Sequence, residues 1–479
     1  MTFPLLCLVG AGGSILVSPL APITLKYVAW SGSLRFESTL PTGALGAVLI
    51  LGICGMTAAS EIQMVNEGVV AKDALYLTRA KFGDIITPHG DCIKVYRGYI
   101  YVTWYQGGMD NRRVWLSRKP VGSGEWKHIE FPHRHVMFRH DRTLADAHNV
   151  IAIGICPKDD TIHLLYDMHA YTPKDFEDDF FNYSVSKKGA ALAPDSEWTL
   201  DLFHPKQTYL NRAIADRNPK VYWRVTYPGF ITTRDGDLIV KWRIGGHMNA
   251  HMYLTKYDGE TWGEAVRWNR TVGEHTTGYY GSFRIFNDRM YSCWHRRMPQ
   301  DQEAGYEINR GLYLAQCADH SGITNWYTVD GVEHALPLLD LEPFKIGEPS
   351  EPGQRMSSGP SFVVTDSGAF HARATVSGKA KHYFRTSPTD PLSVEMGVPN
   401  GDMYAIGDRI YLIALEDGRP VIQTTREGTH NWQTEHRVTD GPTYRRGVTI
   451  RHEESLFYYL LENVEGDKLP IRVLRFDIE

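Results

Sequence analysis

The chain has 479 residues, a formal net charge of −5, 22% charged residues and 12% aromatic residues. A small negative net charge argues against a general nucleic-acid-binding protein, which needs an excess of cations, and we expect no nucleic acid partner. The 44 Gly and 25 Pro, together with the many aromatic residues, indicate a soluble, turn-rich chain and favour an all-β architecture.

The first 60 residues differ from the rest of the chain. Within them, 46–60 has the short apolar core and small-residue end that are typical of a secretory signal, and it is short for a membrane span. We therefore divide the chain into 1–60, a signal or membrane-proximal segment, and 61–479, the folded domain. This division predicts a secreted or periplasmic protein, or one anchored to a membrane through its N-terminal segment.

One unit recurs after residue 85: an apolar strand, a tight turn and a second apolar strand. The turns contain the Gly, Asn, Asp and Ser residues that β-hairpins favour, except in the last unit. The flanking strands alternate or run apolar, as 410–415 does. The seven turns are Tyr96–Gly98, Lys158–Asp160, Asp235–Asp237, Asn287–Asp288, Asp366–Gly368, Gly407–Asp408 and His452–Ser455.

A second element follows several of these units and resembles the Asp-box turn of BNR repeats. It is clearest at Thr255–Trp262, and weaker forms end at Trp126, Trp326 and Trp432. Repeats of this length with four strands each indicate a β-propeller. The seven units thus predict an all-β, seven-bladed β-propeller, in which 61–81 supplies an outer strand that closes the ring. Stacked β-sandwiches are the alternative, disfavoured because no long polar linker divides the chain.

Two neighbouring hairpins place reactive side chains at the same end. Folding the first at its turn brings His148 opposite His169, and folding the second brings Tyr227 opposite Arg243. Opposed side chains on one face of an antiparallel pair lie about 5 Å apart at Cβ. Because the same ends of adjacent blades share one face of a propeller, these two pairs predict a single active site. The prediction assumes hairpins without β-bulges.

The chemistry of these side chains narrows the reaction. Arg243 is a permanent cation that suits a planar carboxylate, and His and Tyr can transfer protons. No pair of acidic residues stands beside them, which disfavours ordinary glycoside hydrolysis. A carboxylate neutraliser beside proton-transfer groups suits β-elimination of a uronic acid, in which C5–H becomes acidic once the carboxylate charge is neutralised.

Four segments, 146–149, 167–169, 227–230 and 241–246, resemble the ulvan lyases of polysaccharide lyase families 24 and 25, which are seven-bladed propellers. Their sites contain two His about twenty residues apart and a Tyr followed by an Arg sixteen residues later, and this chain has that spacing. The resemblance covers roughly residues 85–479. It implies that the partner is ulvan, a sulfated polysaccharide, cleaved between 3-sulfated rhamnose and glucuronate or iduronate to give unsaturated uronate ends.

The resemblance also implies a role for each residue of the site. Arg243 neutralises the uronate carboxylate, Tyr227 and His148 act as base and acid, and His169 supports the carboxylate or the proton transfer. Which of Tyr227 and His148 takes the proton stays open. The alternative for each residue is structural: a hydrogen-bonded His at a strand end, a packed Tyr, or an Arg paired with a neighbouring acid.

Three more residues are candidates for substrate binding. Asn149 follows His148 directly, and Tyr280 pairs with His295 if the third hairpin folds without a bulge. Arg296 belongs to a basic run that either recognises sulfate or forms a solvated surface. The run 133–142, which contains His and Arg residues, has the same two interpretations.

A further set of thiols and imidazoles predicts a structural zinc site. Cys293 lies opposite Cys317 if their connecting loop is centred near residue 305, and His295 shares the face of Cys293. With His275, or His251, these residues provide four zinc ligands. A cross-strand disulfide and two buried thiols are the alternatives. We expect no cofactor for the chemistry itself, because four protein ligands leave no open position on the metal.

Two other functions remain open on the sequence. A sialidase-like propeller glycosidase would explain the Asp-box turns, but we find no Arg cluster with a Tyr–Glu pair and an acidic Asp. A non-catalytic sulfated-glycan-binding propeller would explain the aromatic and basic residues, but leaves the His, Tyr and Arg grouping without a purpose. For each function we expect a monomer.

Overall fold

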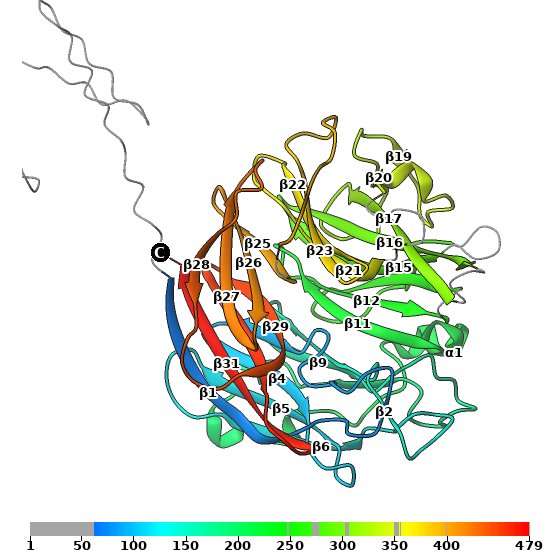
Figure 1. Ribbon diagram of the computed structural model, residues 1–479. Coiled ribbons are helices and arrows are strands. Elements are labelled where there is room, and N and C mark those ends of the chain that lie inside the picture. The colour runs from blue at the N-terminus through cyan, green and yellow to red at the C-terminus, as the bar shows by residue number, and fades with distance from the viewer. Residues whose placement is uncertain are drawn as a thin grey trace, which may run out of the picture. The chain divides into compact units, whose positions relative to one another are not determined.

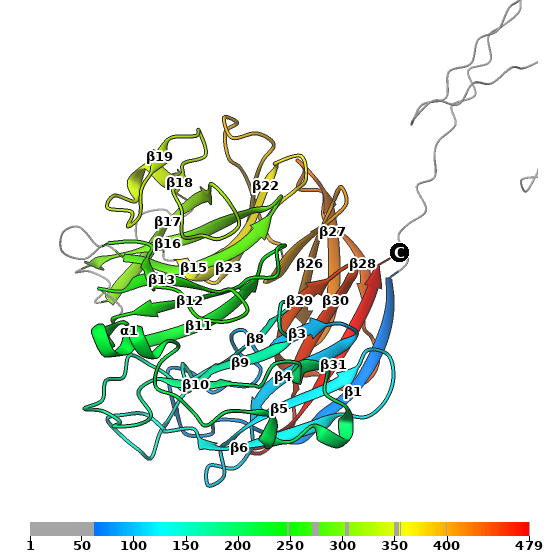
Figure 2. The same ribbon diagram turned by 180° about the vertical axis from the view of Figure 1, so that it is seen from behind.

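The computed structural model describes residues 62–246, 249–270, 277–301, 306–348, 354, 356–398 and 400–478. These residues belong to a compact unit, Ala59–Glu479. Its sheets form a seven-bladed β-propeller, with the blades arranged around a common centre (Figures 1 and 2). The predicted all-β class and the number of blades are confirmed, whereas the segment predicted at 1–60 lies outside the described residues. None of the helices in the described ranges is both long and apolar enough to cross a membrane.

The blades follow one another in chain order. Their strands are β3 (Ile93–Tyr96), β4 (Tyr99–Tyr105), β5 (Arg113–Pro120) and β6 (Lys127–Arg134); β8 (Ile151–Cys156), β9 (Thr161–Tyr166) and β10 (Asn182–Val185); β11 (Val225–Thr232), β12 (Leu238–Ile244), β13 (His251–Tyr257) and β14 (Val266–Arg267); β15 (Thr277–Phe286), β16 (Arg289–Asp301) and β17 (Tyr306–Cys317); β21 (Met356–Val364), β22 (Phe370–Val376), β23 (Lys379–Arg385) and β24 (Ser393–Met396); β25 (Gly401–Ile406), β26 (Arg409–Glu416), β27 (Arg419–Arg426) and β28 (Gln433–Arg437); and β29 (Tyr444–His452), β30 (Ser455–Glu462), β31 (Lys468–Ile478) and β1 (Ile62–Leu75).

Shorter elements connect and cover the blades. They are β2 (Ala80–Lys81), β7 (Ala145–Asp146), β18 (Trp326–Tyr327), β19 (Glu333–His334), β20 (Lys345–Gly347), the α-helix α1 (Arg212–Arg217), and the 3₁₀ helices Ala190–Leu192, Asp195–Glu197, Leu200–Leu202, Pro219–Tyr222 and Glu342–Phe344.

Each of the seven predicted turns joins the first two strands of a blade, which confirms the repeat. The turn between β15 and β16 shows the reason, because Asn287 and Asp288 both have positive φ, 50° and 58°. Asn and Asp tolerate this left-handed conformation better than most residues, and two-residue hairpin turns require it. Local turn chemistry therefore explains why the position of this hairpin can be predicted from its sequence.

The predicted Asp-box at 255–262 is a turn between β13 and β14. Asp258 Oδ1 accepts hydrogen bonds from the backbone N–H groups of Glu260 and Thr261, each at 2.9 Å. The indole of Trp262 then packs in the core between neighbouring blades and donates to the Tyr183 hydroxyl at 2.9 Å. The motif thus ties the outer edge of one blade to the preceding blade.

The ring closes through the N-terminal strand, as the sequence predicts. Strand β1 pairs antiparallel with β31, from Ile62 opposite Ile478 to Leu75 opposite Lys468. Pairing covers an otherwise open sheet edge, and it joins the two ends of the domain in one blade. Glu67 of β1, buried, also forms an ion pair of 2.5 Å with Lys119 of the next blade.

After β1 the chain crosses to the site that the hairpins define. Strand β2 runs parallel to β7, with Lys81 paired to Asp146. This short sheet places Phe82, which is 53% exposed, beside the ends of β8 and β9. The same segment that closes the ring therefore also covers part of the site.

Candidate active site

The two histidines meet as predicted. The β8–β9 hairpin keeps the expected register, with Ile151 opposite Tyr166. The imidazoles of His148 and His169 stack with ring centroids 4.2 Å apart and planes inclined by 19°. Both side chains are partly exposed, 18% and 19%, so their rings reach the surface of the site.

One carboxylate holds both rings. Asp146, with an exposed fraction of 0%, accepts from His148 Nδ1 at 3.0 Å through one oxygen and from His169 Nδ1 at 2.6 Å through the other. Burial alone would raise the pKa of Asp146, but the hydrogen bonds from the two histidines hold it well below its usual range. Asp146 is therefore an ionised acceptor at neutral pH.

The hydrogen bonds to Asp146 determine the tautomers of the two histidines. An ionised carboxylate can only accept, so Nδ1 carries the proton in both rings. In a neutral imidazole Nε2 then has a free lone pair and can accept a proton. Burial lowers the pKa of His169, against the opposing effect of Asp146, which favours its neutral form. The pair thus presents two potential bases.

Tyr227 and Arg243 also meet, although their register differs from the prediction. The β11–β12 pairing is as expected from Thr232 to Gly229, but a β-bulge shifts it, so that Thr226 lies opposite Arg243. The bulge does not separate the side chains: the Arg243 guanidinium lies over the Tyr227 ring, 4.8 Å from its centroid. The Tyr227 ring is 5.5 Å from the His148 ring, which joins the two hairpins in one site.

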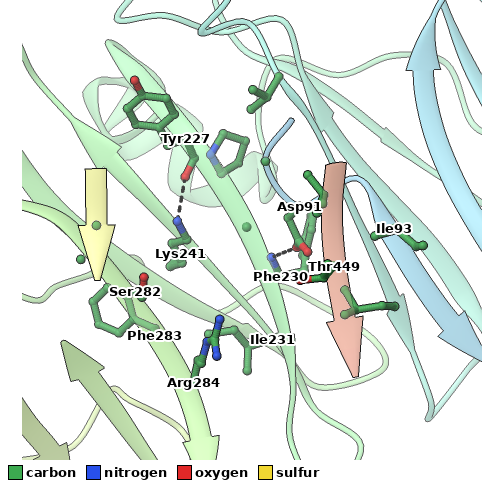
Figure 3. A pocket seen from close by; sticks show the side chains of 18 of the residues that line it. Asp91, Ile93, Tyr227, Phe230, Ile231, Lys241, Ser282, Phe283, Arg284 and Thr449 are labelled. Carbon is green, nitrogen blue, oxygen red and sulfur yellow. Dashed lines mark hydrogen bonds between the residues drawn. The ribbon is translucent and has the colours of Figure 1, made fainter. Parts of the chain in front are cut away.

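The backbone of Tyr227 is strained. Its φ of 54° is rarely adopted by a bulky residue, and such strain persists only where the surroundings fix it. Lys241 supplies one such contact, because its Nζ donates to the Tyr227 carbonyl oxygen at 3.2 Å (Figure 3). The bulge and this hydrogen bond together aim the phenol at the histidines.

Two residues of the site were missed by the sequence reasoning. Asp146 begins the segment 146–149, but its two-residue spacing from His148 gives no sign that its carboxylate binds both rings. Phe82 contacts both histidines edge to face, at 4.7 Å from His148 and 5.4 Å from His169. Its position beside β8 and β9 comes from ring closure, which residue spacing does not reveal.

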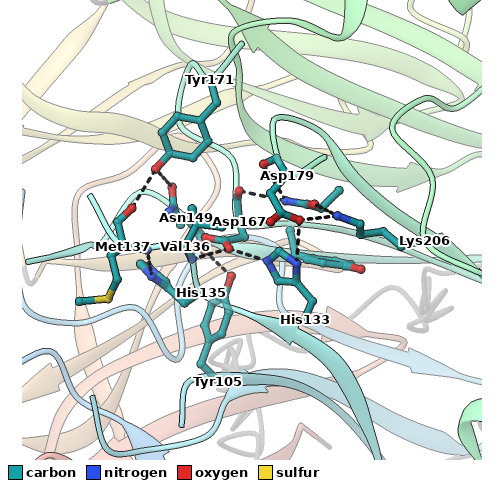
Figure 4. A network of polar contacts seen from close by, with 12 residues as sticks. Tyr105, His133, His135, Val136, Met137, Asn149, Asp167, Tyr171, Asp179 and Lys206 are labelled. Carbon is teal, nitrogen blue, oxygen red and sulfur yellow. Dashed lines mark hydrogen bonds and ion pairs between the residues drawn. The ribbon is translucent and has the colours of Figure 1, made fainter. Parts of the chain in front are cut away.

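Asn149, predicted to bind substrate, does not lie on the surface of the site. Its exposed fraction is 0%, and its side-chain oxygen accepts from the Tyr171 hydroxyl at 3.0 Å. The Asn149 carbonyl accepts from the Tyr105 hydroxyl at 2.7 Å (Figure 4). The prediction of direct substrate contact is therefore wrong, because Asn149 anchors the strand end behind His148.

The basic run 133–142 divides into His133 and His135, which form internal hydrogen bonds, and Arg134, His140 and Arg142, which are exposed. His133 Nε2 donates to Asp167 at 2.6 Å, and the same carboxylate oxygen accepts from the backbone N–H of Val136 at 2.7 Å (Figure 4). Although burial would lower the pKa of His133, hydrogen bonds to Asp167 and Asp179 raise it above its ordinary value. These contacts fix the loop behind the histidine pair.

Arg296 is engaged in an ion pair, and the strand register at Tyr280 differs from the prediction. Arg296 is buried and forms an ion pair with Glu342, so its charge is already matched. A β-bulge places Tyr279 rather than Tyr280 opposite His295, which corrects the predicted register. The side chain of Tyr280 lies outside the described residues.

The predicted site formed by two Cys and two His residues is not assembled. Cys293 pairs with Leu314 rather than Cys317, and the two thiols pack in different hydrophobic clusters. Both are free and buried, so the disulfide alternative is wrong as well. His295 Nδ1 donates to a backbone carbonyl of β17 at 3.1 Å. His275 lies outside the described residues.

Asp146, His148 and His169 can themselves hold a metal ion. One ligand atom from each lies within 4.8 Å of the others, and a carboxylate with two imidazoles is a donor set that divalent transition metals accept. A metal that took the Nδ1 atoms or the Asp146 oxygens as ligands would replace the hydrogen bonds described above. Metal binding and the hydrogen-bonded arrangement are therefore alternatives for this cluster.

The blades, the Asp-box turns and the site define a class, the BNR-type seven-bladed propeller. The family described as "BNR repeat-containing family member" matches residues 99–372. The chain is also 30% identical over 440 residues to the short isoform of ulvan lyase from Alteromonas sp. (strain LOR), covering 83% of both chains. It is 30% identical over 437 residues to the long isoform from the same strain, covering 83% of this chain and 44% of the relative. The chain belongs to the ulvan lyase family.

Solved structures support the same placement. The crystal structure of polysaccharide lyase Uly1 has a TM-score of 0.79 and 26% identity, covering 87% of this chain and 99% of that one. A PL25 ulvan lyase has a TM-score of 0.57 and 14% identity, covering 86% and 95%, a likeness that shows the fold alone. The chain spans less than half the length of the long ulvan lyase isoforms it matches.

Proposed function

We propose that the protein is a polysaccharide lyase that cleaves ulvan by β-elimination next to a uronic acid. The observation that carries this proposal is the meeting of Tyr227, Arg243 and His148 in one site, with a guanidinium over the phenol and the phenol beside the imidazole. Its relatives are named ulvan lyases, and a crystallised ulvan lyase of the same fold was bound to -[GlcA(1-4)Rha3S]-.

The proposed reaction begins with charge neutralisation. The Arg243 guanidinium binds the uronate carboxylate with two parallel hydrogen bonds, which makes C5–H more acidic. Removal of that proton places negative charge on the carboxylate oxygens, beside the same guanidinium. Because Arg243 is held in place before the reaction, it stabilises this charge without reorganising.

Proton transfer then involves the other two groups. In our proposal His148 Nε2, left without a proton by the hydrogen bond from Nδ1 to Asp146, takes the C5 proton. The electron pair of the C5–H bond forms the C4=C5 double bond as the C4–O bond breaks. The Tyr227 hydroxyl donates its proton to the departing glycosidic oxygen. His169 shares the carboxylate of Asp146 and keeps the His148 ring in its stacked position.

The test follows near-ultraviolet absorbance of ulvan with the full chain, because a C4=C5 double bond conjugated to the carboxylate absorbs there. We expect a steady rise with the wild-type protein and a rate about 10²-fold lower or less with Tyr227→Phe, which removes only the hydroxyl. A matched control is Tyr209→Phe, on a partly buried ring outside the site. A saturated reducing end without absorbance would instead indicate a hydrolase, and retention of ulvan without products a binding propeller.

We further propose that the protein is exported. Support comes from 46–60, which has the apolar core and small-residue end of a secretory signal. The size of the substrate agrees, because a polysaccharide must be cut outside the cell membrane. Cell fractionation and N-terminal sequencing of the recovered protein test this: we expect it outside the cytoplasm and shortened near residue 60. Full-length protein confined to the cytoplasm would contradict export.

A further inference from the structure

A cavity of about 1080 Å³ runs along the centre of the propeller, beneath the site. Residues at or beside the first strand of every blade line it, and Tyr227 and Arg243 belong to the same lining. Figure 3 shows part of its wall, with Lys241 and Arg284 among apolar side chains such as Phe283. The cavity is therefore continuous with the site and shares Tyr227 and Arg243 with it.

The cavity lining is strongly basic. Among the residues that the structure describes, the lining has six basic side chains and one carboxylate, Asp91. Asp91 forms an ion pair of 2.5 Å with Lys94 and accepts from the backbone N–H of Phe230, so its charge is matched locally. A cleft that is lined by charges of one sign and has apolar walls focuses its field and concentrates counter-ions. The basic residues are Lys94, Lys241, Arg243, Arg284, Arg446 and Arg451.

Arg446 supplies the most specific sign of a ligand. Across the described residues its guanidinium has no hydrogen-bond partner and no ion pair, and its partly exposed side chain lines the cavity. Burial lowers the pKa of Arg446, while Cys92, Asp402 and Asp84 act in the opposite direction. A guanidinium that faces a cavity without a protein partner has its five N–H groups available to an oxyanion.

Lys241 and Arg284 reach the same cavity from other blades. The Lys241 side chain passes over Gly229, where a Cβ atom would lie 2.8 Å from its Cε, so a larger residue there would displace the end of the lysine. Burial lowers the pKa of Lys241 to about 8, and its one hydrogen bond is to Tyr227. Arg284 is fixed by two hydrogen bonds of 3.0 Å from Nη1, to the carbonyls of Phe362 and Met403.

We propose that this cavity is a binding site for a tetrahedral oxyanion of the sulfate class, held by Arg446, Lys241 and Arg284. Guanidinium groups match the paired oxygens of such an anion, and the ammonium adds a point charge. The anion has two possible sources: free inorganic sulfate, or a sulfate ester of a bound polysaccharide. Binding of the free anion does not depend on the eliminating activity proposed above, so the two proposals can fail separately.

The direct test is crystallographic. Crystals of the full chain are soaked in sodium selenate, whose selenium scatters anomalously and whose shape matches sulfate. We expect an anomalous peak inside the cavity, within about 4–5 Å of the Arg446 guanidinium carbon, as expected for an oxyanion hydrogen-bonded to that group. Peaks confined to the outer surface, with none in the cavity, would overturn the proposal.

A solution test uses thermal unfolding in sulfate and in chloride at equal ionic strength. Sulfate stabilises all proteins by exclusion from their surface, so the informative quantity is the excess stabilisation over variants that lack the site. At saturating sulfate we expect the sulfate-induced rise in melting temperature to be roughly 2 °C larger for wild type than for Arg446→Gln. The rise for Arg446→Lys should lie between these two. The matched control Arg426→Gln, at an exposed arginine, should behave as wild type. Equal sulfate shifts in wild type, Arg446→Gln and Arg426→Gln would contradict the site.

Two further measurements distinguish free inorganic sulfate from a sulfate ester of the polysaccharide as the bound anion. If a sulfate ester enters the cavity, inorganic sulfate competes with it and raises the KM for ulvan. The KM for desulfated ulvan should then not change with sulfate. If the site takes free sulfate, the excess stabilisation persists while KM is unchanged. Either result agrees with an oxyanion site, whereas loss of both the anomalous peak and the excess stabilisation refutes it. A protein that binds selenate but forms no double bond would refute only the proposed function.

Discussion

Replacing Arg243 with alanine is expected to lower kcat/KM for ulvan about 10³-fold, because it removes the preorganised cation next to the developing charge. Arg243 is 4% exposed and lies 4.8 Å over the Tyr227 ring, so no solvent cation can replace it in the same geometry. Arg243→Lys should give an intermediate rate, since it keeps the charge but loses the planar two-point contact. Initial rates of near-ultraviolet absorbance increase give kcat/KM for wild type, Arg243→Ala and Arg243→Lys.

A second substrate makes this test specific. Esterifying the uronate carboxylate removes the charge that Arg243 is proposed to neutralise. The loss of kcat/KM caused by Arg243→Ala should therefore be much smaller on esterified ulvan than on native ulvan. Circular dichroism and thermal unfolding show whether the variant keeps its fold. A folded Arg243→Ala protein with more than about a tenth of wild-type turnover would refute the role, since the expected loss is far larger.

Replacing Asp146 with asparagine is expected to reduce turnover by at least about 10²-fold, because an amide cannot accept from both rings as the carboxylate does. One imidazole then loses its fixed tautomer, and Nε2 of that ring can carry the proton instead. The kcat should fall more than KM rises, since no substrate contact is removed. Asp141→Asn, at an exposed carboxylate of the preceding turn, is the matched control.

The same variant has a predictable effect on stability with pH. The pKa of Asp146 is lower in the folded protein than in the unfolded chain, so its ionisation stabilises the fold above the unfolded pKa. This contribution is fully present at neutral pH and is lost as pH falls below about 4 and through the folded pKa. The difference in unfolding free energy between wild type and Asp146→Asn should therefore shrink in acid. A difference that grew on acidification would contradict the lowered pKa.

Chelation distinguishes a hydrogen-bonded histidine cluster from one that binds a metal ion. If Asp146 acts through hydrogen bonds, dialysis of the wild-type protein against EDTA should leave turnover unchanged. If Asp146, His148 and His169 instead hold a metal, the same dialysis should abolish activity and added Zn²⁺ should restore it. Either outcome also decides how the loss in Asp146→Asn is to be interpreted.

Local sequence by itself determined the repeat and two hairpin registers near their turns. Turn residues such as Asn287 and Asp288 prefer the left-handed conformation, so the seven hairpins could be located without tertiary contacts. The period of two along a strand then fixed which side chains share a face, and it placed His148 beside His169 correctly. The spacing from Tyr227 to Arg243 indicated their contact for the same reason.

Only the tertiary structure decided the details on which the proposed chemistry depends. The bulges at Tyr227 and near Tyr280 shift the register by one residue, and no spacing rule signals them. A register shift likewise separates Cys293 from Cys317, because the error in a predicted loop centre moves both partners to different faces. The sharing of Asp146 by two rings depends on side-chain geometry at the end of one hairpin, whereas the meeting of six cations in one cavity arises from ring closure. Closure brings together residues that are far apart in the chain, and local sequence patterns do not encode such long-range contacts.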